Sequence, residues 1–190
     1  GVSIFNGILT SMVSFEGEDG KQPFVFDICE CPSEKTVYAA TTDHIYVFSN
    51  ERFSFVPFIK DMKQSHILCD NKRLYITNRK GFYVHENGKT IHEDVKGDPN
   101  VHCMALNPRD HSVWMLTKDA LCHYIPSDKS LERKELKSLF GGGVNFSCMA
   151  VTGKLFYIGT KNFGLYKYDM ANGKLEHIDG MGADIAKLYN

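Results

Sequence analysis

The sequence has no long hydrophobic segment and no excess of charge of one sign. Its apolar runs are shorter than the roughly 18 residues of a membrane-spanning helix, so we expect contact with a membrane only through a span outside these residues. The 22 basic and 23 acidic residues are mixed along the chain and leave a net charge of −1. Without a basic stripe to neutralise a phosphate backbone, nucleic acid is not expected to contact this segment.

Long segments with the 3.6-residue periodicity of an amphipathic helix are also missing. The nearest candidate is Ser130–Phe140, which predicts either a short helix or a charged edge strand. The chain instead carries 13 Phe, 9 Tyr and 1 Trp against only 6 Pro. Many of these aromatic residues stand in short stretches with β-branched residues, which suit a pleated, half-buried surface. The composition therefore predicts an all-β protein.

Four segments of the sequence resemble one another and start about 40 residues apart, the spacing of a four-stranded propeller blade. They begin at Val37, Leu74, Val113 and Leu155. Each has an apolar strand that ends in a small polar residue, then a short turn and an alternating apolar and aromatic strand. A short strand precedes each segment and a more polar strand follows it. Each unit therefore reads as four strands, A to D, in a meander, whose apolar faces only neighbouring blades can bury.

Turn residues stand where this reading needs hairpins. Asn87-Gly88 and Asn172-Gly173 separate the predicted C and D strands of the second and fourth units. Both residues of a two-residue hairpin turn must accept positive φ, which Asn and Gly do most readily. The two dipeptides therefore predict tight C–D hairpins.

The repeats predict a β-propeller of four-stranded antiparallel blades, with about four complete blades and a partial blade at each end. We expect blades at 24–60, 65–96, 101–138 and 146–180, strands C and D of a partial blade at 1–20, and strand A of a next blade at 183–190. This register indicates a fragment of a larger, seven-bladed propeller. The alternative is a self-contained five-bladed propeller with an imperfect closing blade.

The fourth segment carries the most informative pattern. Its strands LFYIGT (155–160) and GLYKYD (164–169) and the turn NGKL (172–175) resemble the two-component regulator propeller repeat. The second segment keeps the Gly-aromatic start of strand C at Gly81, whereas the first and third are more divergent. Repeats of this family form the extracytoplasmic sensor of hybrid two-component histidine kinases in gut Bacteroidetes.

The resemblance implies a sensor whose ligand is an oligosaccharide or another small polar molecule. It implies an extracytoplasmic part of an inner-membrane protein, a homodimer formed through the parent protein, and control of polysaccharide-utilisation genes. We expect no catalytic activity in this segment, although the parent protein would be a histidine kinase. Two alternatives remain open: a protein-interaction propeller scaffold, and a propeller lyase or hydrolase.

No motif predicts a metal, a cofactor or a nucleophile. The eight His are scattered over separate predicted strands and turns, and none forms the HExxH pattern of a zinc protease. The single Cys-x-Cys, Cys29 to Cys31, has no second pair at zinc-ribbon spacing. Cys103 and Cys148 fall at equivalent places in two A strands, which we expect to lie too far apart for a disulfide. The cysteines are therefore predicted to be mostly free, buried thiols.

Propeller geometry indicates where a ligand would bind. The B–C and D–A loops share one face, and loops on such a face converge on a common mouth. The candidate ligand-binding residues are polar and stand in these loops: Asp43, His44, Arg79, Lys80, Lys118, Asp119, Lys161 and Asn162 after B strands, and Asn100 and Asn145 before A strands. The competing interpretation is solvated turn chemistry with no ligand.

Overall fold

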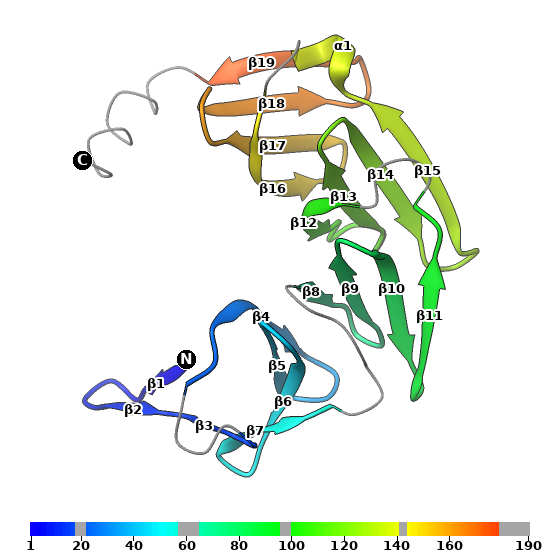
Figure 1. Cartoon of the computed structure of the whole chain (residues 1–190). Helices are drawn as coiled ribbons and strands as arrows, with labels where there is room; N and C mark the ends of the chain where they lie inside the picture. The colour runs from blue at the N-terminus through cyan, green and yellow to red at the C-terminus, as the bar shows by residue number, and fades with distance from the viewer. Residues whose placement is uncertain (18–21, 57–64, 96–99, 141–143, 179–190) are drawn as a thin grey trace. The chain divides into compact units, whose positions relative to one another are not determined.

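A computed structural model of the chain describes residues 1–17, 22–56, 65–95, 100–140 and 144–178 (Figure 1). The chain divides into two compact units, residues 1–94 and 95–190. The A strand expected at 183–190, and the ends of several expected blades, lie outside the described residues. No helix among the described residues is long and apolar enough to cross a membrane.

The first unit contains a meander of four antiparallel strands, labelled A to D in chain order. These are β4 (Val25–Cys31), β5 (Thr36–Thr41), β6 (Ile45–Ser49) and β7 (Arg52–Phe55). A short strand, β3 (Ser14–Phe15), adds to the outer edge of this sheet and runs parallel to β7. Phe15 stacks on Phe53 of β7 with ring centroids 4.6 Å apart, so burial of these two rings holds the added strand in place.

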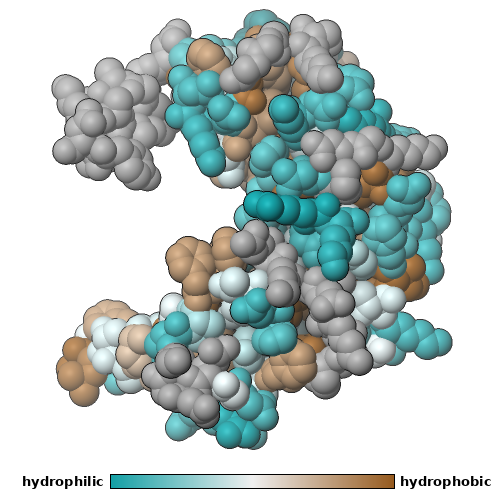
Figure 2. Space-filling view, in the orientation of Figure 1, coloured by the Kyte–Doolittle hydropathy of each residue, from teal (hydrophilic) through white to brown (hydrophobic). Residues whose placement is uncertain are grey.

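The first residues form a separate hairpin of β1 (Ser3–Phe5) and β2 (Thr10–Met12). Within the partial blade expected at 1–20, residues 9–15 therefore form two strands, β2 and β3, which join different sheets, and not a single D strand. Large apolar side chains of this hairpin are exposed, among them Phe5, Ile8 and Leu9. They gather at the β1–β2 end in the space-filling view of Figure 2. Two strands alone offer no second layer that could cover them.

The second sheet of the first unit is β8 (His66–Cys69), β9 (Leu74–Asn78), β10 (Gly81–Glu86) and β11 (Lys89–Glu93). Asn87 and Gly88 join β10 to β11 with φ of 51° and 74°. Both turn residues thus take the positive φ that a tight hairpin requires, which confirms the predicted turn.

The second unit begins with β12 (Val101–Leu106), β13 (Val113–Thr117), β14 (Ala120–Ile125) and β15 (Ser130–Glu135), again an antiparallel meander. One helical turn, α1 (Lys137–Phe140), follows β15. The sequence left strand and helix as alternatives for residues 130–140, and the chain uses both in succession. The apolar Leu136 at the junction is buried, which fixes where the strand ends against the core.

The last described sheet is β16 (Phe146–Thr152), β17 (Leu155–Thr160), β18 (Leu165–Asp169) and β19 (Lys174–Ile178). Its C–D connection differs from the predicted two-residue turn, since only Gly173 takes positive φ and four residues separate β18 from β19. Gly173 N donates to Asp169 O at 2.8 Å and closes a longer turn. The Asn-Gly signal was correct for a hairpin and wrong for its length.

The core lies between consecutive sheets of each unit. In the first unit, Ala40 and Ile45 of one sheet pack with Ile67 and Ile76 of the next. In the second unit, Trp114, Leu116 and Leu121 pack with Phe156, Ile158 and Tyr168. The B strands are the most buried because they carry neighbours on both faces, as five buried residues in a row in β9 and β13 show.

Three of the inner strands carry the same irregularity. The pairing of A with B shifts register between Val25 and Asp27, between Val101 and Cys103, and between Phe146 and Cys148. A bulge that recurs at one place in three blades marks an equivalent position in each of them. Asp27, Cys103 and Cys148 are therefore equivalent residues.

Candidate functional site

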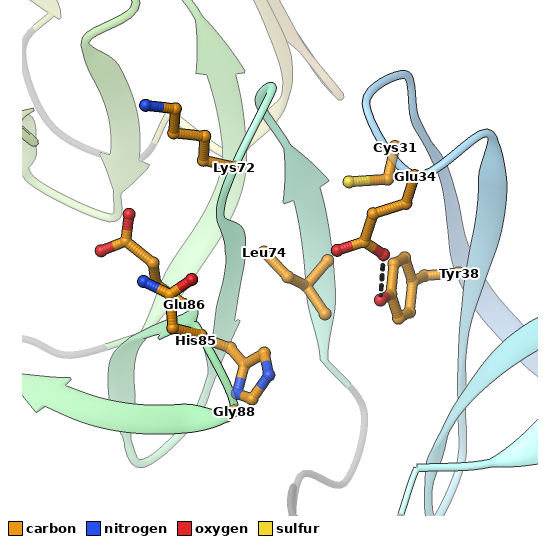
Figure 3. Close-up of a pocket in the computed structure, with 9 residues that line it drawn as sticks. Cys31, Glu34, Tyr38, Lys72, Leu74, His85, Glu86 and Gly88 are labelled. Atoms are coloured by element: carbon orange, nitrogen blue, oxygen red, sulfur yellow. Dashed lines mark hydrogen bonds between the residues drawn. The ribbon is translucent and has the colours of Figure 1, made fainter.

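A polar pocket of about 160 Å³ lies in the first unit, where the A–B turns of both complete sheets meet the C–D turn of the second (Figure 3). This is the face opposite the B–C and D–A loops. The lining residues are Cys31, Glu34, Tyr38, Lys72, Leu74, His85, Glu86, Asn87 and Gly88. In Figure 3, Leu74 and His85 point toward Glu34 and Tyr38, whereas Lys72 and Glu86 extend away from that pair.

One wall of the pocket is a hydrogen-bonded Glu34–Tyr38 pair on the A–B hairpin of the first sheet. The hydroxyl of Tyr38 donates to Oε2 of Glu34 at 2.8 Å. Burial and the adjacent carboxylate raise the pKa of Tyr38 well above its usual value. Tyr38 therefore keeps its proton, and the second carboxylate oxygen of Glu34 can accept a hydrogen bond from a ligand.

The facing wall carries His85 of β10. Its Nδ1 lies 2.9 Å from Oγ1 of Thr90 on β11, which orients the ring. Burial lowers the pKa of His85, although the charge of Glu34 acts in the opposite direction. A neutral imidazole offers one donor and one acceptor, which suits recognition of a hydroxyl group.

A charged network supports the outer rim of the pocket. The guanidinium Nε of Arg73 lies 3.2 Å from Oε1 of Glu86 and its Nη1 lies 3.4 Å from Oδ2 of Asp70. Asp70 is buried and also accepts from the hydroxyl of Tyr75 at 2.6 Å. Burial and Asp70 raise the pKa of Tyr75. Since Asp70 and Arg73 pair with each other, these groups fix the A–B turn of the second sheet and hold Glu86 in position.

A disulfide joins Cys31 to Cys69 beside this pocket, with Cα atoms 5.2 Å apart. The prediction of mostly free thiols was therefore wrong for these two residues. The expectation of a wide separation did not cover this pair, because Cys31 and Cys69 do not stand at equivalent positions of their A strands. The inner strands β4 and β8 also approach each other at His66 and Asp27, where Nδ1 of His66 lies 3.4 Å from Oδ2 of Asp27.

The other cysteines, Cys29, Cys103, Cys122 and Cys148, are free. Burial raises the pKa of Cys29 and of Cys103 to about 12. A thiol with so high a pKa carries almost no thiolate at neutral pH and is a poor nucleophile. Among the described residues, no group of three or more His, Cys, Asp or Glu is arranged to hold a metal ion.

A second concavity, of about 180 Å³, lies on the C–D side of the last sheet. Its lining residues are Lys167, Asp169, Asn172, Lys174 and Glu176. Glu176 already contacts both cations, with Nζ of Lys174 at 2.5 Å and Nζ of Lys167 at 3.6 Å. The side chains of these ion pairs are 36–67% exposed, so the pairs contribute little to stability and the concavity is a weaker candidate.

None of the ten residues proposed from the sequence lines either pocket. Nine of them are exposed: Asp43, His44, Arg79, Lys80, Asn100, Lys118, Asn145, Lys161 and Asn162. The ring of His44 packs edge-on against Phe55 at 4.7 Å. Asp119 is half-buried and lies 2.6 Å from Nη2 of Arg133, so it serves the fold of its own sheet.

Three of the ten residues are brought together in the last sheet. The backbone N–H of Asn145 donates to Oδ1 of Asn162 at 3.3 Å, and the N–H of Lys161 donates to the carbonyl of Asn145 at 2.8 Å. The D–A and B–C loops of one blade therefore meet, as the propeller reading requires. The remaining seven residues stand on other loops.

The sequence did contain a signal for the pocket. Glu34 and Tyr38 flank the A–B turn of the first complete sheet, between β4 and β5. His85 interrupts an apolar C strand. A polar residue at such a position indicates a place where the blade faces something other than core. Propeller geometry alone favours the opposite face, which carries the B–C loops.

A buried aromatic stack lies in the second unit. The rings of Trp114 and His123 are 3.9 Å apart and inclined by 7°, and Phe156 packs edge-on to Trp114. Neither Nε1 of Trp114 nor Nε2 of His123 has a hydrogen-bond partner within the described part of the chain. Burial lowers the pKa of His123, against the opposing charges of Asp110 and Glu132.

The lowered pKa values of His85 and His123 predict acid sensitivity. An unfolded His has a pKa of about 6.5, so below that pH the unfolded chain binds more protons than the folded one. The free energy of unfolding should therefore fall as the pH drops below about 6.5 toward the folded-state pKa values, and these two residues should add no pH dependence above it. Urea denaturation between pH 8 and pH 5 measures the slope.

Variants separate the two histidines. His123→Phe keeps an aromatic ring for the stack but cannot titrate, and His85→Gln removes the second group. Each single variant should reduce the loss of stability on acidification, and the double variant should reduce it further. A double variant with the slope of the unmodified protein would contradict this assignment.

The described chain was compared with known proteins. No protein-family model matches the sequence, and no curated protein matches it. Solved structures do match. The chain has a TM-score of 0.73 with a domain described as the extracellular part of a one-component system of B. thetaiotaomicron, at 16% identity over 92% of this chain and 24% of that chain.

Two further structures agree on the fold. An extracellular domain of the same protein, described as belonging to a hybrid two-component system, matches with a TM-score of 0.65 and 18% identity over 90% of this chain and 23% of that chain. The WD40 β-propeller domain of Doa1 matches with a TM-score of 0.65 and 11% identity over 88% of this chain and 56% of that chain. The predicted β-propeller fold is thus confirmed. The chain spans about a quarter of the extracellular domains that it matches.

Proposed function

We propose that this chain is part of the extracytoplasmic, ligand-sensing propeller of a two-component sensor. The observation that carries the proposal is the similarity of 92% of the chain, at a TM-score of 0.73, to the extracellular domain of a bacterial regulatory system. The resemblance of residues 155–175 to two-component regulator propeller repeats supports the same function independently of the structure.

The Cys31–Cys69 disulfide supports the extracytoplasmic location. Structural disulfides persist in oxidising compartments such as the periplasm and are rare in a reducing cytosol. The disulfide between two inner strands therefore fits the extracytoplasmic location that the repeats indicate. In this proposal the parent protein supplies the membrane anchor, dimerises and carries the histidine kinase that the sensor controls.

The proposed ligand is an oligosaccharide, and the proposed output is transcription of polysaccharide-utilisation genes. The polar pocket alone is too small for such a ligand, since sites for drug-sized molecules have about 300–1,000 Å³ and this pocket has about 160 Å³. It suits one polar group or one sugar unit, held by Glu34, Tyr38 and His85 over the apolar side chain of Leu74. A longer ligand would need further contacts, for which the B–C and D–A loops remain candidates.

A protein-interaction scaffold is the second candidate function. The β-propeller fold, which this chain shares with a WD40 domain over 88% of its length, is equally suited to it. A lyase or hydrolase is the remaining alternative, and turnover of an added substrate distinguishes it from the other two.

Calorimetric titration of the intact protein with a panel of oligosaccharide fragments tests the sensor function. A fragment that binds should also raise the unfolding midpoint, because a ligand at 100 times its Kd stabilises the folded state by about 2.7 kcal/mol. Binding without turnover of the fragment is the expected result. Turnover of a fragment would favour the enzyme. Binding of a peptide, with no heat of binding for any fragment of the panel, would favour the scaffold.

Matched variants decide which face binds. Tyr38→Phe removes one hydroxyl from the pocket, and the double variant Lys161→Ala, Asn162→Ala alters the loop face. Lys174→Ala, in the second concavity, is the control. If the pocket holds a sugar unit, Tyr38→Phe should weaken binding about 5- to 30-fold, the loss of one or two hydrogen bonds, while the control binds normally. Loss of affinity in the loop variant alone would place the ligand on the opposite face.

A further inference from the structure

Inner strands of consecutive blades lie close enough together for side chains on the two strands to contact or bond with one another. In the first unit, Asp27 of β4 and His66 of β8 occupy the same place, since each pairs with the residue just before the end of its B strand. Their side chains are 3.4 Å apart. Four residues beyond Asp27 and three beyond His66, the same two strands are joined by the Cys31–Cys69 disulfide.

Two free cysteines occupy this place in the second unit. Cys103 of β12 follows the register shift of its strand and pairs with Leu116, the residue before Thr117. Cys148 of β16 follows the same shift and pairs with Gly159, the residue before Thr160. The pair of Cys103 and Cys148 is therefore the counterpart of the contacting pair of Asp27 and His66.

Two hydrogen bonds fix the position of β12 relative to β16. Just beyond β12, Nδ2 of Asn107 donates to the carbonyl of Gly153 at 3.3 Å, and the N–H of Gly153 donates to Oδ1 of Asn107 at 3.2 Å. Counting back four residues from Asn107 and five from Gly153 gives Cys103 and Cys148. Burial, and after it the charge of Cys148, raises the pKa of Cys103, which agrees with this register.

We propose that Cys103 and Cys148 form an oxidation site, which closes into a second disulfide between adjacent inner strands when the protein meets a disulfide oxidant. Cys148 is exposed and Cys103 is half-buried, so Cys148 reacts first. Its sulfur lies over Gly159, where a Cβ would stand only 2.5 Å away. Closure requires a rotation about the Cα–Cβ bond of Cys148, which an exposed side chain can make.

The reaction is two successive thiol–disulfide exchanges. The Cys148 thiolate attacks one sulfur of the oxidant, forms a mixed disulfide and releases the other sulfur as a thiolate. The thiol of Cys103 then loses its proton, attacks the Cys148 sulfur and expels the second half of the oxidant. Two protein thiols are oxidised by two electrons, their two protons pass to the products, and the oxidant is reduced to two thiols.

Oxidised glutathione added to the purified intact protein tests the proposal, whether or not the protein is a sensor. Thiol counting should fall from the four free cysteines of the structure to two. Non-reducing peptide mapping should recover a peptide that links Cys103 to Cys148, besides the peptide that links Cys31 to Cys69. Closure should be slow at neutral pH and faster at pH 9, since Cys103 must lose its proton.

Single variants complete the test. Cys29→Ser and Cys122→Ser should retain the linked peptide, because neither residue belongs to the pair. Cys103→Ser should stop at a mixed disulfide of Cys148 with glutathione, and Cys148→Ser should remove the reaction. The proposal is overturned if the unmodified protein itself stops at glutathionylated Cys148, forms a disulfide between two copies through Cys148, or pairs Cys148 with Cys29 or Cys122.

Discussion

Replacement of Cys31 and Cys69 by Ala should lower the free energy of unfolding of the first unit by about 4 kcal/mol. The bond closes a segment with a sequence separation of 38 residues, and a cross-link of that span removes about this much loop-closure entropy from the unfolded chain. With a urea m value of about 2 kcal/mol/M, the midpoint should move down by about 2 M.

Reduction gives a matched control for this prediction. Dithiothreitol should lower the midpoint of the unmodified protein to that of the double variant and leave the variant unchanged. Cys148→Ala, at an exposed free cysteine, should change the free energy of unfolding by less than about 0.5 kcal/mol. An unmodified protein that does not respond to reduction would show that the bond contributes nothing to stability.

Phe156→Ala should destabilise the second unit by about 3–5 kcal/mol, the usual cost of removing a large aromatic side chain from a core. Phe156 is fully buried on β17, with its ring edge-on to Trp114 at 4.7 Å and tilted against Tyr168 at 6.2 Å. Removal therefore loses apolar contacts on two sheets at once. Denaturation monitored by Trp114 fluorescence follows this loss directly, because the only Trp of the chain borders the cavity.

Phe163→Ala is the control for this cavity, since Phe163 stands on the adjacent B–C loop and is 47% exposed. Its replacement should change stability by about 0.5 kcal/mol or less. Equal losses in the two variants would mean that the interface between the two sheets of this unit does not carry the stability of the core.

The strand pattern was readable from the sequence because it depends on local alternation. Side chains alternate between the two faces of a strand, so the apolar runs that start at Leu74 and Val113 predicted buried B strands, which β9 and β13 are. Residues 9–15 were less readable, since nothing local distinguishes one D strand from two short strands that join different sheets.

The candidate site was harder to predict from the sequence. Side chains from the segments 31–38 and 72–88 line one pocket only because the A–B and C–D turns of two sheets meet, and that meeting depends on how the sheets pack. The disulfide was missed for the same reason. The expectation from the repeats concerned equivalent positions of consecutive inner strands, whereas Cys31 and Cys69 are offset by one residue in register and lie 5.2 Å apart at their Cα atoms.

By itself, the sequence determined the fold class, the four-stranded repeat and most strand positions, because alternation and turn residues act within a few neighbouring positions. It also carried the resemblance to sensor repeats, on residues 155–175. Only the tertiary structure decided which side chains meet: the Glu34–Tyr38–His85 pocket, the Cys31–Cys69 bond and the counterpart positions of Cys103 and Cys148. Contacts between blades join residues far apart in the chain, and their distances follow from the packing of sheets that no local pattern encodes.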